Sequence, residues 1–192
     1  MTILIVPGLH GSEPDHWQSH WEAELYNAER VQQENWSSPD FNVWLATLVR
    51  HIREKPGAIL VGHSLGATLV AHLAAQHPNL DIGGALLVAP ADPELTRPPV
   101  PELASFGPLP LDPFHFPAFV IASRTDPYMA PDRARVLANA WEAAFVDVGD
   151  AGHINVASGH GAWPEGRRWL DHLRVWQADL QNYPRGKCLI GA

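Results

Sequence analysis

The chain has 192 residues, of which 46% are hydrophobic and 18% charged, proportions that are ordinary for a globular protein. Its formal net charge is -8, which disfavours binding to polyanions such as nucleic acid. The single cysteine, Cys188, excludes an internal disulfide, and no apolar run approaches the roughly 20 residues of a membrane helix. We therefore expect a soluble, cytoplasmic protein.

Short apolar runs alternate with amphipathic segments along the chain. The first run, Thr2–Val6, has no basic flank, so we interpret it as a strand rather than a signal peptide. Most of the predicted strands are continuously apolar, which is typical of parallel strands covered on both faces. The second is polar and is expected at a sheet edge. After the first strand, the other five are Glu29–Gln33, Ala58–Val61, Gly84–Ala89, Ala118–Ala122 and Ala144–Val148.

Helices are predicted between the strands from apolar residues at helical spacing. Ser38 is a predicted N-cap with Pro39 at the first helical position, and Pro131 and Pro164 open the last two helices. The predicted buried faces are Trp17, Trp21 and Leu25; Phe41, Trp44, Leu45, Leu48 and Ile52; Ala67, Val70, Ala71 and Ala74; Leu137, Ala138 and Trp141; and Trp169, Leu173, Trp176 and Leu180.

This alternation predicts an α/β fold: a three-layer α/β/α sandwich around a mostly parallel six-stranded sheet, in the strand order 2-1-3-4-5-6. Residues 1–182 are expected to form one domain, and residues 183–192 lack periodicity and are expected to be a C-terminal tail. The proline-rich stretch Pro90–Pro117 is predicted to be an ordered loop with a short helical turn.

The pentapeptide Gly62-His63-Ser64-Leu65-Gly66 lies between the third strand and the helical stretch Leu65–Gln76. This strand, sharp turn and helix is the context of a nucleophile elbow, which lifts the serine hydroxyl clear of the sheet. A serine hydroxyl needs a base to accept its proton during attack. Ser64 is therefore the candidate nucleophile.

His153 follows the last strand and is the candidate base, and Asp126 follows the fifth strand and is the candidate acid that orients it. The chain order Ser, Asp, His is the one α/β-hydrolases use. Asp92, after the preceding strand, remains an alternative acid. For the oxyanion we expect the backbone N–H groups of Leu65 and Leu9, with His10 as the alternative to Leu9.

The candidate substrate contacts near the expected site are His10, His16, Trp17 and Trp163. His16 and His20 lie four apart on a helix, but no partner with ligand spacing is evident, so no metal site is expected. Gly8-Leu9-His10-Gly11 lacks the pattern of a nucleotide-binding phosphate loop. Neither a metal nor an organic cofactor is expected.

Together these motifs resemble the α/β-hydrolase superfamily, and more narrowly the small serine hydrolases that include YdeN and retinoblastoma-binding protein nine. The likeness extends from Ile3 to about Leu180. It is carried by Pro7-Gly8 with Ser12 and His16-Trp17, by Gly62–Gly66, by Ser123–Pro127, by Gly152–Asn155 and by Ser158–Gly166.

The resemblance implies a compact hydrolase without a large lid, with esterase-like activity and Ser64, Asp126 and His153 as its triad. A retinoblastoma partner is not implied, because the only cysteine, Cys188, stands outside the binding motif of the human member. The expected partner is a small ester-like molecule, and the oligomeric state is left open. Two alternatives remain: an amide or thioester hydrolase with the same residues, and a binding protein on a hydrolase scaffold.

Overall fold

The computed structural model describes residues 1–94 and 100–182. Its centre is a six-stranded sheet in the order β2-β1-β3-β4-β5-β6, and every neighbouring pair is parallel, which confirms the predicted order. The strands are β1 (Ile3–Val6), β2 (Ala28–Arg30), β3 (Ala58–His63), β4 (Ile82–Val88), β5 (Ala118–Ala122) and β6 (Ala144–Asp147). The predicted tail, residues 183–192, lies outside the described residues.

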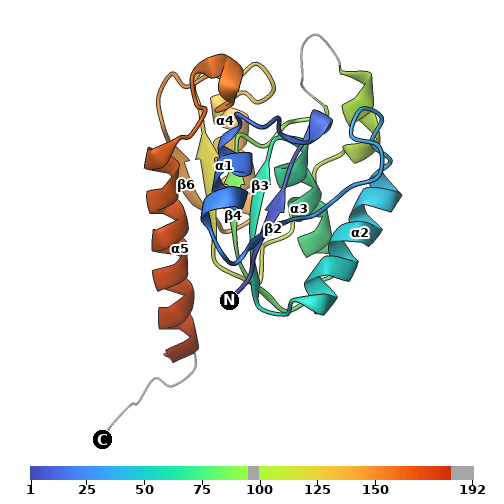
Figure 1. Ribbon diagram of the computed structural model, residues 1–192. Helices are drawn as coiled ribbons and strands as arrows, with labels where there is room; N and C mark the ends of the chain where they lie inside the picture. The colour runs from blue at the N-terminus through green and yellow to red at the C-terminus, as the bar shows by residue number, and fades with distance from the viewer. Residues whose placement is uncertain (95–99, 183–192) are drawn as a thin grey trace, which may run out of the picture.

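Helices cover both faces of the sheet, which confirms the predicted α/β/α layers (Figure 1). They are α1 (Trp17–Glu24), α2 (Phe41–Glu54), α3 (Leu65–Gln76), α4 (Pro131–Ala140) and α5 (Pro164–Asn182), with short 3-10 turns η1 (Leu9–Gly11), η2 (Pro101–Phe106) and η3 (Val156–Ser158). The turn η2 is the helical turn predicted within the proline-rich loop. Among the described residues, no helix is long and apolar enough to span a membrane.

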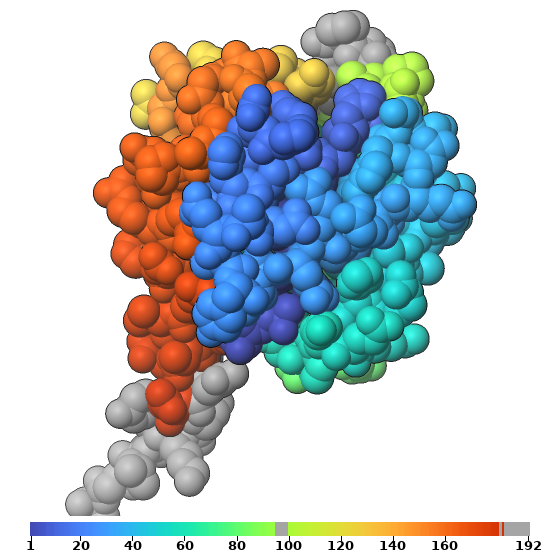
Figure 2. Space-filling view, in the orientation of Figure 1, coloured from blue at the N-terminus to red at the C-terminus, as the bar shows by residue number. Residues whose placement is uncertain are grey.

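The core is divided by the sheet because successive strand side chains point to opposite faces. In β1, Leu4 and Val6 belong to the part of the core that also contains residues of α2, α3 and α4, whereas Ile3 and Ile5 belong to the part that contains residues of α1 and α5. In the space-filling view, α5 and the N-terminal segments form one continuous surface (Figure 2). An ion pair between Arg167 and Glu24 lies on that side of the molecule.

Two local predictions were wrong. The N-cap of α2 is Asp40, whose carboxylate accepts a hydrogen bond from the Val43 amide at 3.0 Å; Ser38 lies in the preceding turn, where its amide donates to Asn35. Ser and Asp are both good N-caps. The sequence favoured Ser38 because Pro39 follows it, and proline is common at the first helical position. In α5, Leu170 is fully buried, whereas the predicted Trp169 lies partly exposed at the edge of the core.

Candidate active site

The elbow around Ser64 is a strained turn between two regular elements. Ser64 has φ 53° and ψ −122°, a conformation that costs a non-glycine residue energy. A side chain at Gly66 would place its Cβ 2.0 Å from the Val6 carbonyl oxygen, and one at Gly62 would lie 2.7 Å from the Ala67 Cα. Both glycines are therefore required by the close approach of β3, α3 and the end of β1.

The loop after β1 runs directly beside the elbow. A Cβ at Gly8 would lie 2.9 Å from the Ser64 Cβ and 3.0 Å from the Leu65 nitrogen. Within the part of the chain that the structure describes, the amides of Leu9 and Leu65 have no acceptor. The His10 amide, by contrast, donates to the Trp36 carbonyl at 3.0 Å. The arrangement leaves Leu9 and Leu65 free to donate to a substrate oxygen.

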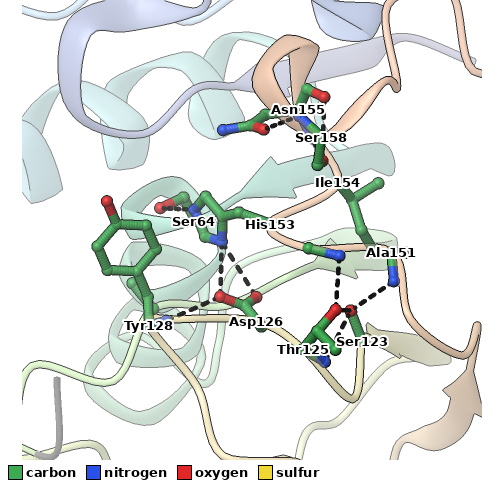
Figure 3. Close-up of polar contacts among 12 residues, drawn as sticks. Ser64, Ser123, Thr125, Asp126, Tyr128, Ala151, His153, Ile154, Asn155 and Ser158 are labelled. Atoms are coloured by element: carbon green, nitrogen blue, oxygen red, sulfur yellow. Dashed lines mark hydrogen bonds and ion pairs between the residues drawn. The ribbon is translucent and has the colours of Figure 1, made fainter. Parts of the chain in front are cut away.

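The three side chains singled out by the sequence come together at the carboxyl edge of the sheet (Figure 3). The Ser64 Oγ lies 2.8 Å from Nε2 of His153, and Nδ1 of His153 lies 3.0 Å from both carboxylate oxygens of Asp126. The carboxylate of Asp126 is buried, its side chain being 1% exposed. A buried, charged acceptor on Nδ1 keeps the proton there, so Nε2 offers its lone pair to the serine hydroxyl.

Asp92, the alternative acid, lies elsewhere. Its carboxylate is fully buried and accepts hydrogen bonds from the Arg133 guanidinium at 3.1 Å and from the Glu94 amide at 2.9 Å. Between these two carboxylates, Asp126 is the one that contacts the His153 imidazole.

Hydrogen bonds from side chains to backbone join the two loops that carry Asp126 and His153 (Figure 3). The hydroxyl of Ser123 accepts from the Ala151 amide at 2.9 Å, and that of Thr125 accepts from the Gly152 amide at 3.0 Å. The Tyr128 amide donates to Asp126 at 2.9 Å, and the Tyr128 ring packs edge-on against the imidazole of His153 at 4.6 Å between ring centroids. These contacts fix Asp126 and His153 relative to each other.

A cavity of about 230 Å³ opens above Ser64 and His153. The predicted contacts His10 and His16 line it. It is lined by Gly8, Leu9, His10, Ser12, Glu13, His16, His63, Ser64, Val100, Leu103, Tyr128, His153 and Asn155.

The other two predicted contacts, Trp17 and Trp163, do not line this cavity, and the prediction that they bind substrate is corrected. Trp17 is fully buried, and its ring lies 5.2 Å from that of Trp163 within the core between the sheet, α1 and α5. Adjacency to a motif in sequence did not show which side of the loop these rings face.

Two buried histidines, His16 and His63, line the cavity. Burial, reinforced by the charge that His153 can carry, lowers the pKa of His16 to about 4. The same causes hold the pKa of His63 well below its usual range. The His63 ring lies 4.8 Å from the ring of His16 and 4.9 Å from that of His153. His16 and His63 therefore stay neutral at physiological pH.

Sequence reasoning missed His63 and Tyr128 as cavity residues. His63 gave one usable signal: it is a polar residue at the end of an apolar strand, directly before the candidate nucleophile. Tyr128 followed Asp126 in an ordinary turn sequence, and nothing in its spacing indicated a contact with the base.

The profile of the family described as "Serine hydrolase" matches residues 3–172. Among solved structures, a YdeN-like hydrolase from Pectobacterium atrosepticum is 35% identical, with a TM-score of 0.81 over 92% of this chain and 91% of that one. The YdeN product of B. subtilis is 23% identical, with a TM-score of 0.75 over 91% and 98%.

A thermophilic esterase from Thermogutta terrifontis shares the fold at 15% identity, with a TM-score of 0.65 over 91% of this chain and 82% of the esterase. Comparison with curated proteins returned no match. Since the family profile spans most of its length, the chain belongs to the serine hydrolase family and is an enzyme of the α/β-hydrolase fold.

Proposed function

We propose that the protein hydrolyses small carboxylic esters through an acyl-enzyme on Ser64. The observation that carries this proposal is the continuous contact from the Ser64 hydroxyl through His153 to Asp126, at 2.8 and 3.0 Å, on the wall of the cavity. That geometry matches a nucleophile and base within hydrogen-bond reach, with the base oriented by a third group.

Acylation proceeds by attack of the Ser64 oxygen on the ester carbonyl while Nε2 of His153 accepts the hydroxyl proton. The amides of Leu65 and Leu9 donate to the oxyanion that forms. Collapse of this intermediate breaks the bond to the alcohol, which receives the proton from His153. Water then attacks the acyl-enzyme by the same steps, which release the acid and restore Ser64.

The cavity supports small substrates. Its volume of about 230 Å³ lies near the lower limit of ligand pockets, roughly 300–1,000 Å³. Its lining includes apolar groups from Leu9, Val100 and Leu103, which suit an alkyl chain, and polar groups from Ser12 and Asn155, which suit a polar group. We expect short acyl chains to be preferred.

A panel of p-nitrophenyl esters of increasing acyl length tests the proposal, with matched thioesters and anilides. We expect kcat/KM to be highest for short esters. In Ser64→Ala it should fall below detection, and in His153→Ala it should fall steeply. Faster turnover of the matched thioesters or anilides would mean that the enzyme is a thioester or amide hydrolase instead. Full ester hydrolysis by Ser64→Ala would overturn the mechanism.

A further inference from the structure

The backbone around His153 adopts a conformation that needs support. Gly152 has φ 56° and Ile154 has φ 48°, so the base is flanked by two residues in the left-handed region. A β-branched residue rarely adopts this region, because its side chain clashes with its own backbone. The turn persists only if the surrounding contacts outweigh that strain.

The carbonyl of His153 itself accepts one of these contacts. It lies 2.9 Å from Nε2 of His63, which is 5% exposed and precedes the nucleophile. Since a carbonyl oxygen can only accept, the proton of the neutral His63 ring resides on Nε2. The base is thus tied at its main chain to the strand that carries Ser64.

The next carbonyl along the chain is held from another element. The indole Nε1–H of Trp17, the first residue of α1, donates to the Ile154 carbonyl at 2.9 Å. Trp17 is fully buried, and its ring packs edge-on against His63 at 5.7 Å between centroids. Two buried donors from β3 and α1 therefore bind successive carbonyls of the turn.

We propose that His63 and Trp17 are positioning residues that hold the His153 turn, and with it the imidazole, at hydrogen-bonding distance from Ser64. This inference rests on the proposed role of His153 as the base. Neither side chain needs to contact the substrate's reacting atoms for this effect. Loss of either bond lets the strained turn relax and moves the imidazole away from the Ser64 hydroxyl.

The chain offers a matched control for Trp17. Trp21 is also buried, belongs to the same core cluster and lies 4.7 Å from Trp17 between ring centroids. Its indole nitrogen, however, has no hydrogen-bond partner among the described residues. The substitution of phenylalanine removes the same atoms at both positions, but only at Trp17 does it remove a bond to the turn.

The test compares steady-state kinetics of Trp17→Phe and Trp21→Phe on one p-nitrophenyl ester, with thermal unfolding measured in parallel. We expect kcat to fall about 10- to 100-fold in Trp17→Phe, with KM changed by less than about threefold, because a displacement of roughly 1 Å can cost about 10²-fold. In Trp21→Phe we expect kcat within about twofold of wild type. Equal losses in the two variants would mean that packing alone matters, and would overturn the inference.

His63→Phe provides a second test on a different element, and it decides the matter if Trp17→Phe does not fold. Its control is His72→Phe, since His72 is 7% exposed and donates to the Phe106 carbonyl at 2.7 Å, outside the cavity. We expect kcat to fall in His63→Phe and to be preserved in His72→Phe. A preserved kcat in His63→Phe would overturn the inference.

His153→Ala separates this inference from the proposed function. If that variant loses activity while Trp17→Phe and His63→Phe keep the wild-type kcat, only the positioning role fails. If His153→Ala keeps full activity, the proposed mechanism itself fails.

Discussion

The elbow that carries Ser64 and the loops that carry Asp126 and His153 are built by different means. The elbow joins two regular elements, and its shape is set by backbone packing at Gly62 and Gly66. Asp126 and His153 lie in irregular loops after β5 and β6, and side-chain hydroxyls bonded to main-chain amides hold these loops. Backbone packing therefore holds Ser64 in place, whereas individual hydrogen bonds hold Asp126 and His153.

This difference predicts separate responses to mutation. Changes at the elbow should act mainly on folding, because its tight contacts belong to the core. Changes in the two loops should act mainly on kcat, because the loops carry the imidazole.

Among changes in the two loops, the largest expected effect on catalysis is that of Asp126→Asn. The amide nearly preserves the shape of the side chain but favours the wrong tautomer of His153, and we expect kcat to fall by about 10⁴-fold with little change in the unfolding midpoint. Ester hydrolysis and thermal unfolding, measured on the same preparation, check both halves of this expectation.

Asp92→Asn is the matched control for that variant. It weakens a buried ion pair with Arg133, so we expect a loss of stability of roughly 3 kcal/mol and no comparable loss of kcat. A larger drop in kcat for Asp92→Asn than for Asp126→Asn would show that the wrong acid was assigned.

Gly66→Ala should produce the largest loss of stability at the elbow. The new methyl group would lie 2.0 Å from the Val6 carbonyl oxygen and 2.5 Å from the Pro7 carbonyl oxygen, both of them backbone atoms that cannot move independently. We expect destabilisation of at least about 3 kcal/mol by urea unfolding, or no folded protein. In Gly161→Ala the nearest atom lies 3.4 Å away, so we expect little change; equal stability of the two variants would contradict the packing argument.

Acidification should lower the stability of the folded protein. His16 is held neutral with a pKa of about 4, against about 6.5 in the unfolded chain, and the pKa of His63 is lowered as well. The unfolded chain therefore binds more protons, so the stability that these groups contribute is complete above about pH 6.5 and is lost as the pH falls toward about 4. We expect His16 alone to account for roughly 2–4 kcal/mol over that window.

Urea unfolding between pH 7.5 and 4.5 measures this loss. The free energy of unfolding should change less steeply with pH in His16→Gln than in the wild-type protein, because the substituted side chain does not titrate. Identical slopes would show that His16 binds protons equally well in the folded and unfolded states.

The smallest expected effect is that of Thr125→Val, which removes the acceptor for the Gly152 amide. We expect a loss of about 1 kcal/mol in stability, together with a measurable fall in kcat at constant KM. A rise in KM alone would indicate a role in binding substrate rather than in holding the loop.

The same difference explains what the sequence revealed. The strand order, the bounds of α3 and the three candidate site residues could be predicted because apolar runs, glycines and chain order carry them. The bonds from Ser123 and Thr125 could not, since any serine or threonine can accept an amide in some fold. For Trp17 the sequence carried two indications: helical spacing predicted a buried ring, and its place beside His16 suggested a substrate contact. The structure supports the first, since Trp17 is fully buried.

Labelling with a fluorophosphonate probe, followed by mass spectrometry of the modified peptide, tests the central claim most directly. Formation of one covalent adduct on Ser64 is predicted, at a rate that falls steeply in His153→Ala, with no adduct in Ser64→Ala. Modification of a different residue, or none under conditions where esters are hydrolysed, would contradict the assignment of the nucleophile.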